Sequence, residues 1–275
     1  MKFKIIFIIF NAIIVFSFLF IFFMPFLILG WDYTQVFWAN NWILAVIFVV
    51  IMGGLNAYFI SNWKLFSLLE EENWTGLISY LEDRIYNRHR ITKQNIRILV
   101  NTYVVTSSPE KINELEIYLR DERPKMVPAF AVQLGIPYLL RNEPEDMERY
   151  FGKIMKDPRC AELNWVKWNY GFSLMLQQRI EEARDVLVEV LDGTKNPVLR
   201  LITAYLLDAF SASDATVAAR VQDVRSAVRG KYDAESWQKE IEKQRNNLQV
   251  LVLSKLIRDA TNWLFDDRQN EVSAG

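Results

Sequence analysis

The N-terminal part of the chain is apolar over an unusually long stretch, and this constrains the fold most. From Ile5 to Leu29, 25 residues pass without a charged side chain. As a helix rising about 1.5 Å per residue, this stretch crosses a hydrocarbon core of about 30 Å with some tilt. A cleaved signal peptide is the competing interpretation, because Lys2 and Lys4 resemble its charged start. The stretch exceeds the ~7–15 apolar residues of a signal peptide and no A-x-A-like site follows, so we expect a membrane-spanning helix.

A second apolar stretch follows after a short gap. Ile43 to Ile60 comprises 18 uncharged residues, which is just enough to span a bilayer. The intervening Trp31 to Asn41 is too short for a domain and is expected to form a loop. Residues 1–62 are therefore predicted to form a transmembrane hairpin with spans at 5–29 and 43–60.

The basic residues around the two spans predict their orientation. Lys2 and Lys4 precede the first span and Lys64 follows the second, whereas the connecting loop carries no Lys or Arg. The positive-inside rule therefore places both termini in the cytoplasm. Tryptophans stand at both expected membrane boundaries: Trp31, Trp38 and Trp42 at the outer one and Trp63 at the inner one. We expect an integral membrane protein, of a type that suits the bacterial cytoplasmic (inner) membrane.

Two asparagines and two small residues stand inside the spans. Asn11 and Asn56 would both lie roughly 6–9 Å from the cytoplasmic edge, so they could hydrogen-bond across the hairpin. Gly53 and Ala57, four residues apart, would let a neighbouring helix approach closely. We hypothesise that this face packs the hairpin or binds another membrane subunit; chance tolerance of single polar and small residues is the alternative. No ion path is expected, because the spans carry no charge.

The charge beyond the hairpin is nearly balanced and excludes several functions. Residues after 63 carry 32 acids and 30 bases, which lack the basic footprint of a nucleic-acid binder. The single cysteine, Cys160, cannot form an internal disulfide, and the single histidine, His89, cannot build a His-rich metal site. Gly171-Phe172-Ser173 lacks the second glycine of a nucleophile elbow, and no phosphate-binding glycine loop is present. We expect no catalytic residues, metal or cofactor and therefore no enzymatic role.

Signals for helix starts recur through the rest of the chain. Taking Trp74, Pro109, Pro144 and Ile180 as equivalent positions gives spacings of 35, 35 and 36 residues. Proline at the first helical position followed by acids suits a helix start, because the first amides lack partners and the helix dipole favours negative charge there. Strand-like alternation is absent, so helix–turn–helix units are predicted.

The length and columns of these units resemble tetratricopeptide (TPR) repeats. Two units match best: Leu134-Gly135, Tyr138, Met147, Phe151, Ile154 and Asp157-Pro158, then Tyr170-Gly171, Leu174, Ala183, Leu187, Val190 and Asn196-Pro197. The resemblance covers residues 63 to about 230, and the other units retain less of the pattern. Met147 and Ile112 depart from it, standing where the family prefers alanine. The resemblance implies an all-α solenoid over 63–232; a non-repetitive helical bundle is the alternative.

In the TPR family the first helix of each pair lines a concave groove that binds a partner. Mapped onto this sequence, the lining residues of the two best units are apolar: Val132, Ile136, Leu139, Trp165, Trp168, Phe172 and Met175. Exposed apolar surface of that extent normally has a partner, so these residues are the expected protein-binding groove. The alternative is that the tryptophans are simply interior packing.

The C-terminal region, residues 233–275, is expected to form one long helix from Ala234 to Phe265, because the stretch lacks Gly and Pro. Its second half is apolar on more than one face and must therefore be buried. We expect it to cap the last repeat, lie along the groove or join a second copy of the protein. The tail from Asp266 is expected to fray.

A basic cluster lies close to the second span. Its members are Arg84, Arg88, Arg90, Lys93 and Arg97, and no acid stands among them. They are expected to contact anionic lipid headgroups, each contributing about 1 kcal/mol near the surface. An ordinary solvated turn is the alternative.

These expectations favour a membrane-anchored scaffold or adaptor whose groove binds other proteins at the membrane, as a component of a membrane complex. The expected partners are membrane-associated proteins, the lipid bilayer and, as a further candidate, a second copy of the chain; nucleic acid is not among them. The alternative is a structural or accessory subunit of a transport, secretion or motility assembly that acts mainly through the hairpin.

Overall fold

The computed structural model describes residues 2–266, and every regular element in that part is helical. The chain divides into two compact units, residues 1–102 and 103–275. The elements of the first are α1 (Lys2–Ser61), α2 (Trp63–Glu70), α3 (Trp74–Glu82), a π-helical turn (Asp83–Asn87) and α4, which runs from Lys93 to Val105. All-α is therefore the fold class, as expected. The expected fraying of the tail falls on residues 267–275, outside the described part.

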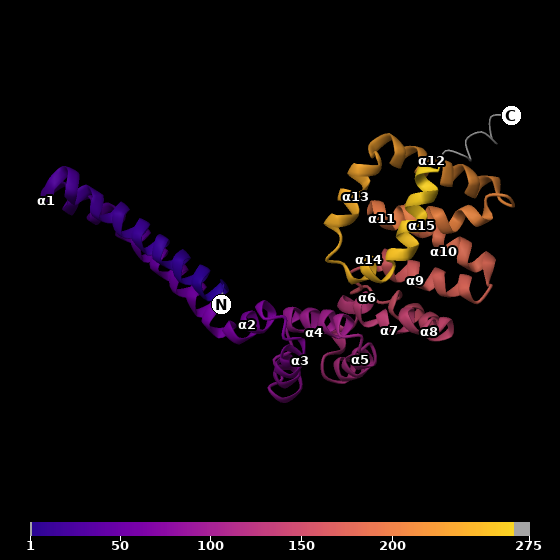
Figure 1. Cartoon of the computed structure of the whole chain (residues 1–275), viewed down its shortest axis with the longest axis horizontal. Helices are drawn as coiled ribbons and strands as arrows, with labels where there is room; N and C mark the ends of the chain where they lie inside the picture. The colour runs from indigo at the N-terminus through magenta and orange to yellow at the C-terminus, as the bar shows by residue number, and fades with distance from the viewer. Residues whose placement is uncertain (1, 267–275) are drawn as a thin grey trace. The chain divides into compact units, whose positions relative to one another are not determined.

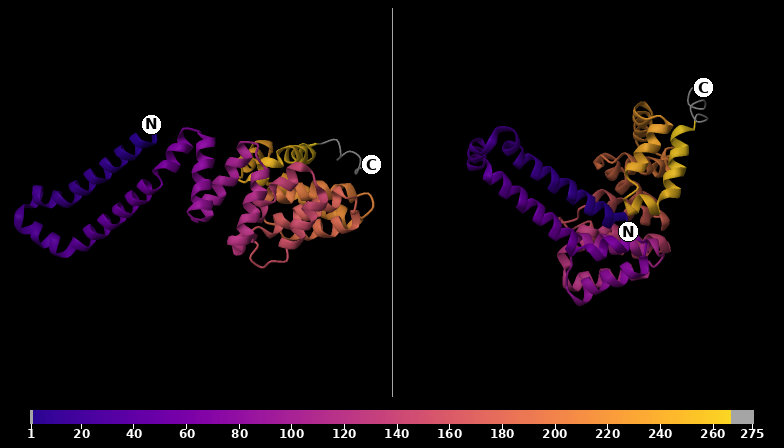
Figure 2. Two further views of the ribbon diagram at one scale, coloured as in Figure 1. Left: turned by 90° about the horizontal axis from the view of Figure 1, so that it is seen from below. Right: turned by 60° about the vertical axis from the view of Figure 1, so that its left-hand side comes forward.

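The second unit is a continuous series of helices joined by short turns (Figures 1 and 2). In order they are α5 (Glu110–Glu122), α6 (Ala131–Leu134), α7 (Ile136–Arg141), α8 (Pro144–Ile154), α9 (Leu163–Leu176), α10 (Ile180–Gly193), α11 (Pro197–Leu207), α12 (Ala215–Lys231), α13 (Ala234–Lys243), α14 (Leu248–Val252) and α15 (Ser254–Phe265). Single 3₁₀ turns occupy Pro124–Met126, Pro128–Phe130 and Asp208–Phe210.

The N-terminal helix α1 is folded back on itself at Gly30, giving two arms that lie side by side (Figure 1). The arms, Lys4–Ile28 and Gly30–Ser61, are each long and apolar enough to cross a membrane. Gly30 has φ 79°, a conformation that side chains with a Cβ rarely adopt, so the reversal takes place at a single residue. We call residues 4–61 the apolar hairpin.

The expectation of a loop from Trp31 to Asn41 was wrong, because these residues are helical and extend the second arm. Two polar side chains in this stretch bond to their own helix: Thr34 Oγ1 donates to the Gly30 carbonyl at 2.8 Å and Asn41 Nδ2 to the Phe37 carbonyl at 2.9 Å. The chain reverses at Gly30 alone, so Trp31 to Asn41 are not needed for the turn and form the first part of the second arm.

Aromatic rings form the contact between the two arms. Phe18 stacks on Phe48 with centroids 4.4 Å apart, and Phe7 meets Phe59 at 5.3 Å. Between these two pairs, Asn56 Nδ2 donates to Asn11 Oδ1 at 2.8 Å. The hydrogen bond predicted between the two asparagines is therefore confirmed.

The predicted helix starts are confirmed at three of the four recurring positions, and the fourth is offset by one residue. α3 begins at Trp74, α5 at Glu110 directly after Pro109, α8 at Pro144 and α10 at Ile180. Side-chain caps act at the starts of α3 and α13: Asn73 accepts from the Gly76 amide at 2.9 Å, and Asp233 forms a capping box with Ser236. Such caps satisfy amides that have no partner within the helix.

In the second unit the consecutive helices from α8 to α12 pack against one another: α8 on α9, α9 on α10, α10 on α11 and α11 on α12. The core between them is apolar, and its largest fully buried side chains include Trp168, Trp237, Tyr103 and Phe151. Gly135 allows one close approach, because a Cβ at this position would lie 2.3 Å from Phe151 Cζ.

The C-terminal region is not the single long helix expected from Ala234 to Phe265, and that prediction was wrong. It is divided into α13, α14 and α15. The first break ends at Asn247, whose side chain accepts from the Gln249 amide at 3.0 Å and so starts a new helix. A capping asparagine therefore interrupted a stretch that lacks Gly and Pro.

Candidate interaction site

Most of the residues expected to line an open groove are part of the core. Val132 and Ile136 are 1% and 0% exposed, and Trp165 and Trp168 are 5% and 0% exposed. The expectation of an open partner surface at these four residues was therefore wrong. The remaining three predicted residues, Leu139, Phe172 and Met175, are half-buried.

The C-terminal segment, α14 and α15, covers the helices that carry Val132 and Ile136, since its α14 packs on α6 and α7. Figure 1 shows α14 beside these two helices. Its Leu248 and Val250 and the neighbouring Leu253 are buried. A polar link also joins it to α9, since Gln249 Nε2 donates to Asn169 Oδ1 at 2.7 Å with both residues buried. The C-terminal region thus packs on its own chain, which was one of the arrangements expected for it. The apolar pattern of this region was visible in the sequence, but the helices that it packs against were not.

The end of α15 is held by two arginines of α12. Arg225 Nη2 donates to the carbonyls of Trp263 at 2.8 Å and Asp266 at 2.9 Å, and Arg229 donates to the Leu264 carbonyl. The last carbonyls of a helix lack intrahelical partners and carry partial negative charge, so cations stabilise them. These contacts were not predicted, because the sequence around Arg225 and Arg229 does not indicate which helix end lies beside them.

Trp168 lies at the centre of an aromatic cluster on α9. Its ring stacks on Phe172 with centroids 5.1 Å apart at an interplanar angle of 12°, and Trp165 meets it edge-on at 6.2 Å. The indole Nε1 of Trp168 is buried and has no hydrogen-bond acceptor among the described residues. The two tryptophans of this cluster therefore belong to the core, and the half-buried Phe172 extends the cluster to the surface.

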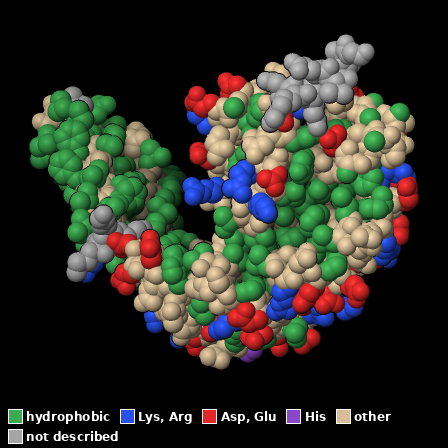
Figure 3. All heavy atoms as spheres, turned by 45° about the vertical axis from the view of Figure 1, so that its right-hand side comes forward, with side chains coloured by type: hydrophobic (Ala, Val, Ile, Leu, Met, Phe, Trp, Pro, Cys, Tyr) green, Lys and Arg blue, Asp and Glu red, His purple; other side chains and the backbone are tan. Residues whose placement is uncertain are grey.

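An apolar surface remains partly open on the same neighbouring helices. Leu140 on α7 is 48% exposed and Leu251 on α14 is 47% exposed. α14 contacts α7 directly, and α6 contacts α7, α9 and α14. Figure 3 shows hydrophobic side chains gathered on one face of the domain with charged side chains around them. We define the α7–α9–α14 surface as Leu139, Leu140, Phe172, Met175, Leu176 and Leu251.

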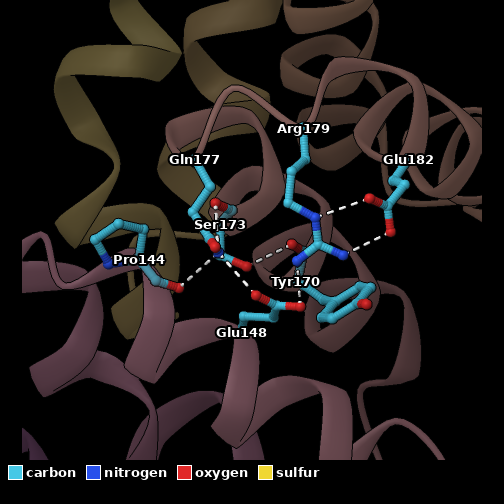
Figure 4. A network of polar contacts seen from close by, with 7 residues as sticks. All are labelled: Pro144, Glu148, Tyr170, Ser173, Gln177, Arg179 and Glu182. Atoms are coloured by element: carbon cyan, nitrogen blue, oxygen red, sulfur yellow. Dashed lines mark hydrogen bonds and ion pairs between the residues drawn. The ribbon is translucent and has the colours of Figure 1, made fainter.

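A charged network ties α8 to the turn between α9 and α10 (Figure 4). Glu148 accepts from Gln177 Nε2 at 2.9 Å and from Arg179 Nη1 at 2.6 Å. Arg179 also forms an ion pair with Glu182 at 2.6 Å. The hydrogen bond from Gln177, followed by that from Arg179, lowers the pKa of Glu148 below its ordinary value.

This network predicts a pH-dependent contribution to stability. Because the pKa of Glu148 is lower in the folded state, its stabilisation is present above the unfolded pKa of about 4.3 and is lost as pH falls through the folded value. Glu148→Gln should lower the free energy of unfolding by about 0.5–1 kcal/mol at pH 7, since the group is partly solvated, and by less at pH 3.5. Urea unfolding of the detergent-solubilised protein at both pH values measures this.

Glu235→Gln is the matched control, because the Glu235–Lys239 ion pair is exposed and lies within one helix. Its effect on unfolding should be smaller than that of Glu148→Gln at pH 7. An equal loss for Glu148→Gln at pH 7 and pH 3.5 would contradict the assignment.

The small residues of the hairpin do not take part in the contact between its arms. Gly53 and Ala57 are exposed, and a Cβ built on Gly53 meets no atom within 4 Å. The hairpin packs through Asn11, Asn56 and its aromatic rings instead. Of the two roles expected for Gly53, packing within the hairpin is therefore excluded and contact with another membrane subunit stays a prediction.

The basic residues after the second arm differ in their surroundings. Arg84 is half-buried and donates to the Tyr80 hydroxyl at 2.9 Å, and Arg88 forms an ion pair with Asp83 at 2.8 Å. Arg90, Lys93 and Arg97 are exposed, as is Arg88. Contact with lipid headgroups stays a prediction for the exposed members of this cluster.

A cavity of about 520 Å³ lies beside α5, α7 and α8 and was not predicted from the sequence. It contains a buried carboxylate, Glu116, paired with Arg120 four residues on. A Glu–Arg pair at this spacing is common on solvated helix surfaces, so its burial could not be read from the residues alone.

Comparisons with known proteins place most of this second unit in one family. The family model described as "Uncharacterised Treponema protein" matches residues 111–266, which is more than half of the chain. A protein of Treponema pallidum (strain Nichols), described as "Uncharacterized protein", is 24% identical over 248 residues, covering 86% of this chain and 78% of that protein. No solved structure matches. The matched residues include α8 to α15 and with them the α9 cluster and the C-terminal segment, so the chain belongs to the family described as "Uncharacterised Treponema protein".

Proposed function

We propose that this protein is a membrane-anchored adaptor. The apolar hairpin crosses the cytoplasmic membrane with both termini inside, and the helical domain binds a segment of another membrane-associated protein. The length and apolar character of both hairpin arms, together with Lys4 and Lys64 at the same end, support this topology. Confinement near the bilayer raises the effective concentration of the domain towards membrane-bound partners.

We also propose that the helical pairs stack in a TPR-like manner. The consecutive packing of α8, α9, α10 and α11 and the regular helix starts support this arrangement. In this proposal the C-terminal segment takes the place of a partner on part of the concave face. The partner then binds at what remains open.

The observation that carries the adaptor proposal is the α7–α9–α14 surface. Its two most exposed leucines, Leu140 and Leu251, lie on helices that contact each other, and α6, which contacts both helices, also contacts α9, the helix of the half-buried Phe172 and Met175. An exposed apolar group next to a packed aromatic cluster is typical of a site that binds another protein.

Substitution of both leucines tests the adaptor proposal. Leu140→Glu with Leu251→Glu should reduce recovery of a cross-linked partner at least tenfold, because a charge would be desolvated at the contact. The measurement is in-cell photo-crosslinking from position 175 of the full-length protein. Ile117→Glu is the control: this α5 residue is 56% exposed and lies outside the surface, so the cross-link should persist.

The second candidate is a structural or accessory subunit that acts through the hairpin. It is favoured by the exposed face of Gly53 and Ala57, which a neighbouring helix could approach closely. Under this alternative Gly53→Leu abolishes partner recovery and the leucine substitutions have no effect. The reverse result supports the adaptor.

A further inference from the structure

The cavity beside α5, α7 and α8 is built from both apolar and charged groups. Its volume of about 520 Å³ lies within the range of sites for small ligands. Its lining includes the apolar Pro124 and Val127, the rings of Tyr138 and Tyr150, and the charged Arg120 and Lys153. It therefore has an apolar wall with charged groups set into it.

Two phenol rings form an aromatic part of this wall. The Tyr138 and Tyr150 rings lie with centroids 5.1 Å apart and planes inclined by 35°. Tyr150 is fixed in place, because its hydroxyl donates to the Ala131 carbonyl at 3.1 Å and its side chain is buried. Such a wall suits a planar apolar group, since aromatic rings pack well in offset or tilted arrangements.

A buried carboxylate orients the guanidinium in the cavity. Glu116 is 2% exposed, and it accepts hydrogen bonds from Arg120 Nε at 3.1 Å and from Nη2 at 2.6 and 2.7 Å. Arg120 Nη1 makes no hydrogen bond to any described residue. The Arg120 side chain is 52% exposed, so a ligand can reach this nitrogen. The guanidinium is thus held by one edge and keeps a donor free for a ligand.

The charges around the cavity leave one positive charge unmatched. Each lining acid has a basic partner: Glu116 pairs with Arg120, Asp146 with Arg149 at 2.8 Å, and Asp157 with Arg159 at 2.6 Å. Lys153 also lines the cavity, and within residues 2–266 no acid pairs with it. Because Arg159 lies outside the lining, the lining residues sum to zero, but Lys153 has no acidic partner among the described residues and can therefore pair with an anion.

The Tyr138 hydroxyl supplies a further donor. It makes no hydrogen bond within the described chain, and burial, with the nearby Glu116 carboxylate adding to it, raises the pKa of Tyr138. The phenol therefore keeps its proton at neutral pH and can donate to a carboxylate.

We propose that this cavity binds a carboxylate attached to a planar apolar group. The carboxylate lies between Lys153, Arg120 and the Tyr138 hydroxyl, and the apolar group packs on Tyr138 and Tyr150 with Pro124 and Val127. Two sources share this chemistry: a free aromatic acid, and a polypeptide that ends in an aromatic residue. The proposal goes beyond the adaptor function and does not depend on the α7–α9–α14 surface.

Calorimetric titration of the full-length protein in detergent tests this proposal. The probes are 3-phenylpropionate, its primary amide, a tripeptide ending in phenylalanine with a free carboxylate, and the same tripeptide amidated. We expect at least one acid to bind saturably and its amide to bind at least tenfold more weakly. Binding of phenylpropionate alone identifies a small aromatic acid as the ligand, and preference for the peptide identifies a polypeptide C-terminus.

Matched lysine variants assign the binding to this cavity. Lys153→Gln should weaken the bound acid about fivefold to tenfold, whereas Lys156→Gln, an equal charge change on an exposed residue outside the cavity, should leave the affinity unchanged. Both lysines are exposed, so both variants should fold, which circular dichroism checks. The proposal is overturned if neither acid binds at about 10 mM, if acid and amide bind equally, or if the two lysine variants behave alike.

Discussion

Removal of residues 248–275 should abolish cooperative folding of the helical domain and cause it to aggregate. α14 and α15 supply core residues, among them Ile257, Ala260 and Leu264, and they cover α6, α7 and α11. Burial of each large apolar side chain contributes about 1.5–3 kcal/mol, so losing several removes most of a typical net stability of about 5–15 kcal/mol. The buried Arg225 would also lose the carbonyls of Trp263 and Asp266. Thermal unfolding followed by circular dichroism, with size-exclusion chromatography, measures both effects.

A shorter truncation is the control for this prediction. Removal of residues 267–275 leaves α15 and the carbonyls that bind Arg225 in place, so unfolding should remain cooperative. If the longer truncation yielded a soluble domain with unchanged cooperativity, the C-terminal segment would not be part of the core.

Trp168→Ala should lower the free energy of unfolding by about 3–5 kcal/mol, which is the usual cost of truncating a buried large aromatic residue. Trp168 is fully buried and packs between Trp165 and Phe172, so alanine would leave a cavity that two rigid rings cannot readily fill. Urea unfolding of the detergent-solubilised protein, monitored at a wavelength specific for helix, measures the change.

Two further variants separate packing from hydrogen bonding at this position. Trp168→Phe should cost less than the alanine variant, because the indole Nε1 has no acceptor in the described structure and its loss leaves no partner behind. Ile117→Ala should change the stability by no more than about 0.5 kcal/mol, since Ile117 lies exposed on α5. A similar loss for Trp168→Ala and Ile117→Ala would show that α9 is not in the core.

The features predicted correctly from sequence depend on neighbouring residues or on a simple geometric constraint. The helix starts at Trp74, Pro144 and Ile180 follow from signals within one turn: an asparagine cap before the first, proline at the first position of the second, and acids in the first turn of the second and third. The Asn11–Asn56 hydrogen bond follows from the length of two apolar stretches and the helical rise alone. Neither prediction required knowledge of which helices pack together.

The predictions that failed depend on packing between distant segments or on the backbone conformation at a single residue. Val132, Ile136, Trp165 and Trp168 were assigned to an open surface because the apolar side of a helix looks the same whether a partner or the same chain covers it. The break before α14 depends on Asn247, which can cap a new helix or continue an old one. Whether Trp31 to Asn41 would form a loop or a helix depended on how tightly Gly30 turns the chain.

By itself the sequence determined the helical class, the paired apolar arms and the positions where helices begin, because hydrophobic length and end-capping act locally along the chain. The tertiary structure decided that α14 covers α6 and α7, that Glu116 lies buried beside a cavity, and that Leu140 and Leu251 stay open. These outcomes depend on which surfaces exclude water from each other. The hydrophobic effect is non-directional, so the residues reveal how much apolar area must be buried but not what buries it.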